Sequence, residues 1–93
     1  MTFKGTKDPS ETVDFYIDWS DTLAQVSPAD TISTSSWTAD NGMTVQSDSS
    51  TTTSATAWVS GGTVRKYCNL VNTVVTAGGR TLERTIAVKI QDL

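Results

Sequence analysis

The chain contains no histidine and only one cysteine, and these two absences remove most of the familiar catalytic chemistry. Without histidine it lacks the commonest general base, metal ligand and physiological pH switch. Cys68 has no partner for a disulfide within the chain and no histidine to activate it as a nucleophile. A Gly-rich phosphate loop before a helix and a Gly-x-Ser-x-Gly elbow are both missing. We therefore expect no enzyme, no cofactor and no catalytic residue.

Charge and long apolar runs are also scarce. Only 18% of the residues are charged and the net charge is −3, which argues against nucleic acid as the main partner because phosphate binding needs clustered Lys and Arg. No uninterrupted apolar run approaches the ~20 residues of a membrane span, and the N-terminus has no apolar signal region. We expect a protein without a membrane span that is made in a cytoplasm.

The chain is rich in Thr and Ser rather than in charged residues. Thr occupies 17 positions and Ser occupies 11 of the 93, a composition typical of strands. A chain of this length forms one domain with a small core, because it buries only roughly 60–65% of the surface that its unfolded form exposes.

The strongest local pattern is a long hairpin near the C-terminus. Residues 67–76 are rich in β-branched and aromatic residues, and Ala77-Gly78-Gly79-Arg80 supplies the glycines of a tight turn. The returning segment, Thr81 to Gln91, alternates between apolar and polar side chains. We expect it to bury Ile86, Val88 and Ile90, and Cys68 to behave as a small buried hydrophobe.

Further strands precede the hairpin. Residues 13–19 alternate strictly and predict a half-buried strand with Asp14, Tyr16 and Asp18 on its outer face. Residues 31–38 form a strand by composition, but Ile32 and Trp37 fall on opposite faces, which indicates a bulge or a place for Trp37 at a sheet rim. Other strands are expected at residues 43–46 and 55–59, with turns at 40–42 and 60–63. Residues 20–30 are predicted as coil, although Leu23, Ala24 and Val26 could also form a single helical turn capped by Ser20 or a short irregular edge. Residues 47–53 are predicted as a loop or fraying edge.

Six or seven short strands with turns every ten or so residues predict an all-β fold, an immunoglobulin-like antiparallel β-sandwich. We expect residues 1–12 to form an N-terminal arm and residues 13–93 a single sandwich domain. Trp19 and Trp37 belong in its core, and Asn72 should be hydrogen-bonded to the backbone of a neighbouring loop.

The candidate contact residues form a partner interface rather than a catalytic site. Trp58 leaves the face shared by Ala55, Ala57 and Val59, so it is either an exposed interface anchor or covered by the arm or a neighbouring strand. Arg80 at the hairpin tip and Arg84, expected on the outer face, are contact candidates or solvated cations. Asp14, Tyr16 and Asp18 offer an acidic surface, which either meets a basic partner or is a solvated face that keeps an edge strand from aggregating. Asp14 and Asp18 are ~13 Å apart along the strand, too far to hold one metal ion together.

Several segments together resemble one family, the small immunoglobulin-like virion proteins of tailed bacteriophages, often described as fiber-tail adaptors. The matching segments are residues 7–11, 14–20, 30–32, 36–38, 56–63, 69–73, 79–81 and 83–84. The chain departs from the family pattern at Tyr67-Cys68 and in a longer loop over residues 20–28. The resemblance implies a structural role in the virion tail and supplies no catalytic motif.

The first hypothesis is a non-enzymatic phage virion protein that links tail or baseplate to fiber components, and that can form a homo-oligomer in the virion. A carbohydrate or host-surface binding module is the alternative, with Trp58 and Tyr16 stacking on sugar rings. A head-completion or decoration protein is a further alternative, and a hydrolase with paired carboxylates is the last.

Overall fold

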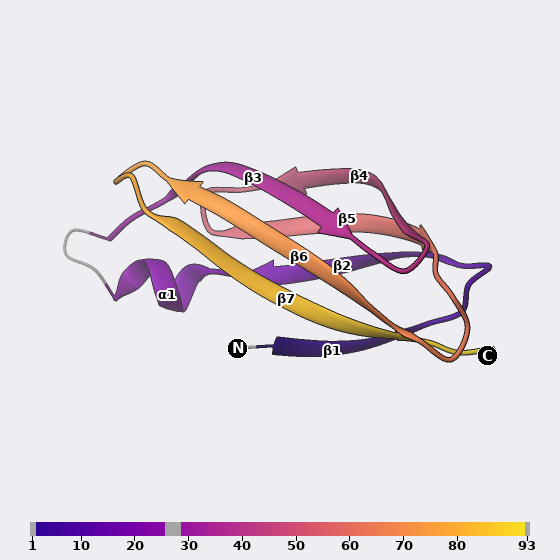
Figure 1. Cartoon of the computed structure of the whole chain (residues 1–93). Coiled ribbons are helices and arrows are strands. Elements are labelled where there is room, and N and C mark those ends of the chain that lie inside the picture. The colour runs from indigo at the N-terminus through magenta and orange to yellow at the C-terminus, as the bar shows by residue number, and fades with distance from the viewer. Residues whose placement is uncertain (1, 26–28, 93) are drawn as a thin grey trace.

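The structure is a sandwich of two β-sheets, seen in a computed structural model that describes residues 2–25 and 29–92. These residues form seven strands and one short helix (Figure 1). In chain order they are β1 (Thr2–Lys7), β2 (Thr12–Asp18), α1 (Ser20–Ala24), β3 (Ile32–Ala39), β4 (Met43–Ser50), β5 (Ser54–Gly61), β6 (Tyr67–Thr76) and β7 (Thr81–Ile90).

The sheet topology is that of an immunoglobulin-like sandwich. One sheet has the order β1-β7-β6-β3 and the other the order β2-β5-β4. Every strand pair is antiparallel except β1 with β7, which is parallel. The predicted all-β fold class and strand number are therefore confirmed.

The β6–β7 hairpin is the longest element, as predicted, and its alternation sets the core. Tyr67 pairs with Lys89 at one end and Val75 with Thr81 at the other. Cys68, Leu70 and Val88 are fully buried on its inner face. Burying an aliphatic side chain such as Leu70 or Val88 contributes roughly 1.5–3 kcal/mol relative to leaving it exposed.

The core lies between the two sheets and draws on nearly every element. Its buried apolar members are Ile17, Trp19, Leu23, Ile32, Trp37, Met43, Ala55, Ala57, Val59, Cys68, Leu70, Val74, Ile86, Val88 and Ile90. Both predicted core tryptophans are buried, and the predicted bulge in β3 lies between Ile32 and Thr34, which lets both Ile32 and Trp37 face inward.

Three local predictions were wrong or incomplete. Residues 20–24, predicted as coil, form α1, while residues 26–28 of that predicted coil lie outside the described residues. β4 continues to Ser50 through most of the predicted loop, because pairing with β5 overrides the Ser/Thr-rich composition. The segment predicted as an arm contains β1, which pairs along β7 from residue 2 to residue 7, while residue 1 is not described.

Asn72 binds the neighbouring strand β3 and an indole, not the backbone of a loop as predicted. Its Oδ1 accepts a hydrogen bond of 2.9 Å from Trp19 Nε1. Its Nδ2 donates to Ser35 Oγ at 2.9 Å and to the carbonyl oxygen of Ser36 at 3.0 Å, both in β3. This buried amide thus joins the two sheets through Trp19.

Candidate protein interface

The outer face of the β2-β5-β4 sheet carries two exposed aromatic side chains beside carboxylates. Trp58 in the central strand β5 is 38% exposed and Tyr16 in β2 is 59% exposed. Asp14 lies directly opposite Trp58 in the register, and Tyr16 lies opposite Thr56, which makes Tyr16 the diagonal neighbour of Trp58. We call Asp14, Tyr16, Asp18 and Trp58 the acidic aromatic face.

Strand alternation explains why this face is exposed. In β5 the inward positions hold Ala55, Ala57 and Val59, all with no exposed surface. The residues between them must point to the other side of the sheet, which places Trp58 outward as predicted. Small alanines on the inner side let the sheet approach its partner sheet closely, while the large indole stays on the outer surface.

Asp18, at the end of this face, also contacts the start of the helix α1. Its Oδ1 accepts a hydrogen bond of 2.9 Å from the Ser20 backbone N–H, at the first residue of α1. This hydrogen bond, together with one from the Ser20 side chain, lowers the pKa of Asp18 below its usual value. Asp18 therefore serves the local fold, and Asp14 is the better residue for testing the charge of the face.

Arg84 lies on the inner face of β7, not on the outer face as predicted. It pairs with Asn72 and shares the two-residue period of Ile86, so it must point inward. Its guanidinium carbon lies 4.7 Å from the centroid of the Trp19 ring, a cation–π contact. Arg84 also borders an open pocket of about 420 Å³ that is lined by Ile17, Asp18, Trp19, Asp21, Thr22 and Gln25.

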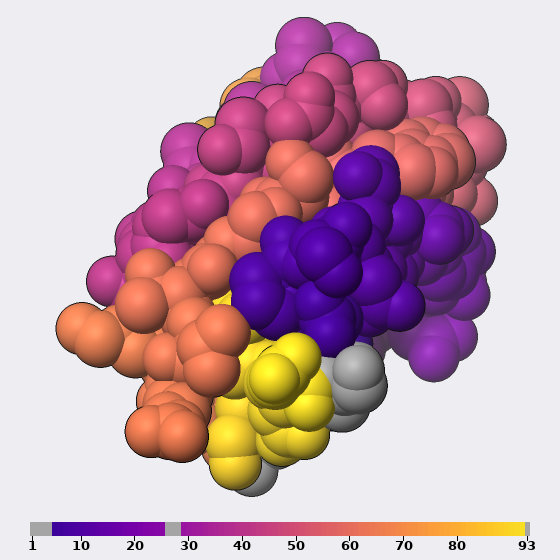
Figure 2. Space-filling model, turned by 90° about the vertical axis from the view of Figure 1, so that its right-hand side faces the viewer, coloured from indigo at the N-terminus to yellow at the C-terminus, as the bar shows by residue number. Residues whose placement is uncertain are grey.

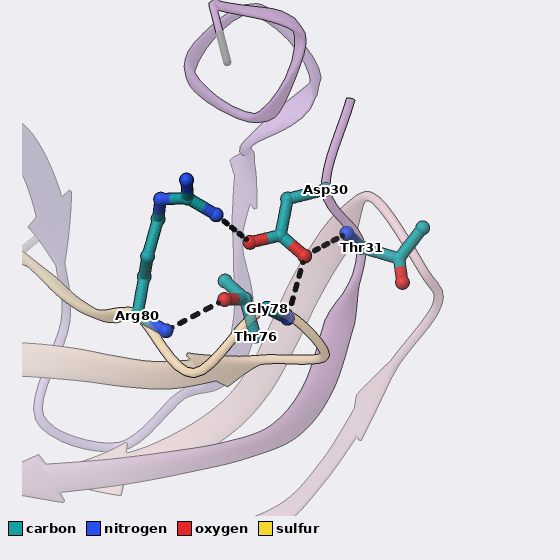
Figure 3. A network of polar contacts seen from close by, with 5 residues as sticks. All are labelled: Asp30, Thr31, Thr76, Gly78 and Arg80. Carbon is teal, nitrogen blue, oxygen red and sulfur yellow. Dashed lines mark hydrogen bonds and ion pairs between the residues drawn. The ribbon is translucent and has the colours of Figure 1, made fainter. Parts of the chain in front are cut away.

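Arg80, the candidate at the hairpin tip, is held by a carboxylate (Figure 3). Its Nη1 lies 2.8 Å from Asp30 Oδ2, and the Asp30 side chain is only 5% exposed. Asp30 Oδ1 accepts hydrogen bonds of 2.9 Å from the backbone N–H groups of Thr31 and Gly78. The Arg80 N–H donates to the Thr76 hydroxyl at 2.9 Å. Because Asp30 precedes β3 by two residues, its bonds to Gly78 and Arg80 fix the turn to the start of this strand.

These contacts favour the ionised form of Asp30. The hydroxyl of Thr76 contributes most to lowering the pKa of this carboxyl well below its usual range, and the N–H groups of Thr31 and Gly78 and the Arg80 guanidinium add to the effect. Burial acts in the opposite direction and is outweighed. The tip that presents Arg80 is therefore a fixed turn at neutral pH.

The Asp30 contacts predict an acid-sensitive fold. Because the pKa of Asp30 is lower in the folded than in the unfolded chain, its stabilisation is fully present above the ordinary value of 3.8 and is lost as pH falls toward the folded value. We expect the melting temperature to fall with pH below about 4. Asp30→Asn should have a lower melting temperature at neutral pH and a shallower fall in acid. Thermal melts of both proteins at several pH values check this.

Asp14→Asn is the control for that measurement, since it makes the same substitution at an exposed carboxylate of β2, away from the hairpin turn. A melting temperature of Asp30→Asn that falls as steeply as that of the unsubstituted protein would contradict the assignment.

Asp30 was missed by sequence reasoning, and the available signal was weak. It precedes β3 by two residues and lies 50 positions from Arg80, so only the fold brings the two together. Lys7 was missed for the same reason. It is buried at the end of β1, and its Nζ donates to the carbonyl oxygens of Gly61 at 2.7 Å and Asp8 at 2.8 Å.

No cluster of three or more potential metal ligands occurs among residues 2–25 and 29–92. Within the same residues, no helix has the length and apolar character needed to cross a membrane. The predicted contact residues fall into two groups: Asp14, Tyr16, Asp18 and Trp58 share one sheet face, whereas Arg80 and Arg84 belong to the other sheet and are engaged by Asp30 and Trp19.

The sheet topology defines a small immunoglobulin-like domain. Residues 7–89 match the family described as podophage GP4 fiber-tail adaptor protein gp77, and the chain belongs to this family. The family is one of phage fiber-tail adaptors, which supports a structural adaptor role, and the predicted resemblance is confirmed. No curated protein sequence matches the chain.

Proposed function

We propose that the chain is a non-enzymatic adaptor that links tail or baseplate to fiber components, and that the acidic aromatic face is one of its contacts with another virion protein. The observation that carries this proposal is the exposed pair of Trp58 and Tyr16 on a regular sheet. Aromatic side chains on rigid backbone are the residues that most often dominate binding energy.

The position of Trp58 suits an anchor. It lies in the central strand of its sheet, between Asp14 of β2 and Ser47 of β4. Strand pairing on both sides fixes its backbone before any partner arrives, so little ordering cost opposes binding. A partner that covers the indole would also surround it with contacts that exclude water, as is typical of binding hot spots.

The Arg80 turn is a candidate for the second contact that an adaptor needs. It projects at one end of the long hairpin and is held by Asp30 and by the Thr76 hydroxyl. The Arg80 side chain remains 49% exposed despite its ion pair. Loops held on a rigid scaffold are common binding elements.

Trp58→Ala should weaken capture of the cognate tail or fiber protein by about 30-fold or more, the effect of losing about 2 kcal/mol at a hot spot. Val75→Ala is the matched control, because Val75 is 39% exposed, close to the 38% of Trp58, but lies on the other sheet. The purified chain and variants are mixed with each tail and fiber protein of the same phage and followed by light scattering after chromatography. Lack of association in every mixture would overturn the adaptor proposal.

A carbohydrate or host-surface binding role is the second candidate, and the same face supports it. Two neighbouring aromatic rings beside carboxylates and hydroxyls can stack on sugar rings and bind their hydroxyls. A glycan array probed with the unsubstituted chain, Trp58→Ala and Tyr16→Ala tests this role. Binding that does not depend on either residue would exclude the face as a sugar site.

A further inference from the structure

Charge is segregated along the chain and between the two sheets. Residues 8–64 hold eight of the ten Asp and Glu residues and none of the seven Lys and Arg residues. Because β2, β4 and β5 fall within this stretch, their sheet carries no cationic side chain. All seven cations lie on β1, on β7, in the turn between β6 and β7, or in the loop that precedes β6.

Three of these cations gather at one end of the sandwich with exposed apolar side chains. Arg65 and Lys66 lie in the loop before β6, and Lys89 lies opposite Tyr67 in the β6–β7 pair, with its Nζ 6.0 Å from the centroid of the Tyr67 ring. Val64 is 41% exposed beside them. We call these five residues, Val64 to Tyr67 and Lys89, the basic end.

The backbone of the basic end is fixed by the last strand. The Arg65 N–H donates to the Ile90 carbonyl at 2.8 Å, and the Ile90 N–H donates to the Lys66 carbonyl at 3.0 Å. An open pocket of about 410 Å³ lies here, lined by Val64, Arg65, Lys89, Ile90, Gln91 and Asp92. Figure 2 looks onto this end, where the loop before β6 (orange) projects beside the C-terminal residues (yellow).

The basic end and the acidic aromatic face are complementary in both charge and apolar character. Five large hydrophobic side chains are exposed among the described residues, and four of them belong to these two surfaces: Tyr16 and Trp58 to one, Val64 and Tyr67 to the other. The acidic aromatic face therefore combines two apolar side chains with carboxylates. The basic end combines two apolar side chains with three cations, which outnumber the one carboxylate, Asp92, that lines the pocket beside them. Surfaces of opposite potential steer association and fix its orientation.

We propose that the acidic aromatic face of one copy binds the basic end of a second copy, head to tail. This inference rests on the proposed function, because it identifies the protein that contacts the acidic aromatic face as another copy of the chain. Arg65, Lys66 and Lys89 would approach Asp14 and Asp18, and the rings of Trp58 and Tyr16 would cover Val64 and Tyr67. Cationic side chains over aromatic rings add a further favourable contact, already present within the chain between Arg84 and Trp19.

The contact is heterologous, because its two halves lie on different parts of the molecule. A symmetric face-to-face contact would bring the Asp14 carboxylates of two copies together, and an end-to-end contact would bring the cations together; both are unfavourable. A heterologous contact repeats from copy to copy and closes into a ring or continues as a chain. Such repetition would present many equivalent hairpin tips to the other virion components.

The test uses two variants that each damage one half of the contact. Asp14→Lys reverses charge on the face, and Lys66→Glu with Lys89→Glu reverses it at the basic end. Glu83→Lys is the control, since Glu83 is an exposed carboxylate of β7 outside both surfaces and its charge change equals that of Asp14→Lys. Melting temperatures establish that each variant is folded, and light scattering after chromatography gives the molar mass at low and high salt.

We expect the unsubstituted chain and Glu83→Lys to form oligomers that dissociate as salt rises. Each of the other two variants should lose self-association by about tenfold or more. Mixed together, the two variants should regain association, because the basic end of the first and the acidic aromatic face of the second are both unchanged.

A chain that stays monomeric up to about 1 mM, where a contact of about 4 kcal/mol would be half formed, would overturn this inference. Oligomers that survive both charge reversals would overturn it as well. Neither result decides the adaptor role, which is measured separately by capture of tail and fiber proteins. A monomer that captures them through Trp58 would leave the proposed function standing without self-assembly.

Discussion

Asn72→Leu should be among the most destabilising single substitutions in this domain, although it replaces one buried side chain by another of similar size. The Asn72 side chain accepts from Trp19 Nε1 and donates to Ser35 Oγ and the Ser36 carbonyl. Leucine leaves the Trp19 N–H buried without an acceptor and removes both donated bonds. Each buried group left unsatisfied costs about 1–3 kcal/mol, so we expect a loss of about 3 kcal/mol.

That loss is large for a domain of this size, whose total stability is of the order of 5–15 kcal/mol. It corresponds to a fall in melting temperature of roughly 12–24 °C. Urea unfolding followed by tryptophan fluorescence, together with thermal melts, measures both quantities. Asn69→Ala is the control on the same strand, since Asn69 is exposed and its side chain makes, within the described part of the chain, one long hydrogen bond of 3.4 Å to Asp40.

The two buried tryptophans provide an internal comparison. Trp19 Nε1 donates to Asn72, whereas Trp37 Nε1 is buried with no hydrogen-bond partner among the described residues. Trp19→Phe should therefore cost more than Trp37→Phe, and it should cost less in an Asn72→Leu background, where its acceptor is already gone. Equal and additive costs would contradict the role assigned to the Asn72 amide.

The sandwich was predictable because its signals are local and repeat every two residues. In β2, β5 and β7 the alternation places Ile17, Val59 and Val88 inward, and the structure buries all three. Ala77 to Arg80 marked the hairpin turn, and Asp40-Asn41-Gly42 marked the turn between β3 and β4, where Asn41 and Gly42 both have positive φ.

The elements that escaped prediction depend on contacts between distant residues. β1 has no clear alternation and forms because the outer edge of β7 offers backbone partners to it. β4 is extended by its pairing with β5 through Ser50, against a composition typical of loops. Asp30 acquires its role only when Gly78 and Arg80 arrive from 48 and 50 residues away.

Among the candidate contact residues, too, the side chains placed by a local signal were oriented correctly. Trp58 and Tyr16 were placed outward by strand period alone, and the structure exposes both. Arg84 was misplaced because it was grouped with the turn, although its separation of two from Ile86 already put it on the inner face. What Trp58 contacts in the virion stays a prediction, because a partner leaves no periodic signal in the chain that it binds.

Gly61→Ala is the second substitution expected to have a large effect, because it combines two costs. Gly61 has φ of +76°, in the left-handed region that costs an L-residue roughly 1–2 kcal/mol. A Cβ there would lie 2.7 Å from the carbonyl oxygen of Gly42, a backbone atom that receives the Gly62 N–H at 3.1 Å. Backbone cannot rotate away as a flexible side chain can, so the β3–β4 turn must shift.

The shift would spread to β1, since the Gly61 carbonyl accepts a hydrogen bond of 2.7 Å from the buried Lys7 Nζ. We expect Gly61→Ala to lose about 3 kcal/mol in urea unfolding, the strain plus one weakened buried hydrogen bond. Gly79→Ala is the matched control: its φ is +87°, and nothing lies within 4 Å of a Cβ built there. It should lose only about 1 kcal/mol from backbone strain. Equal losses in the two variants would show that strain alone acts and that Gly61 does not fasten β5 to the neighbouring turn.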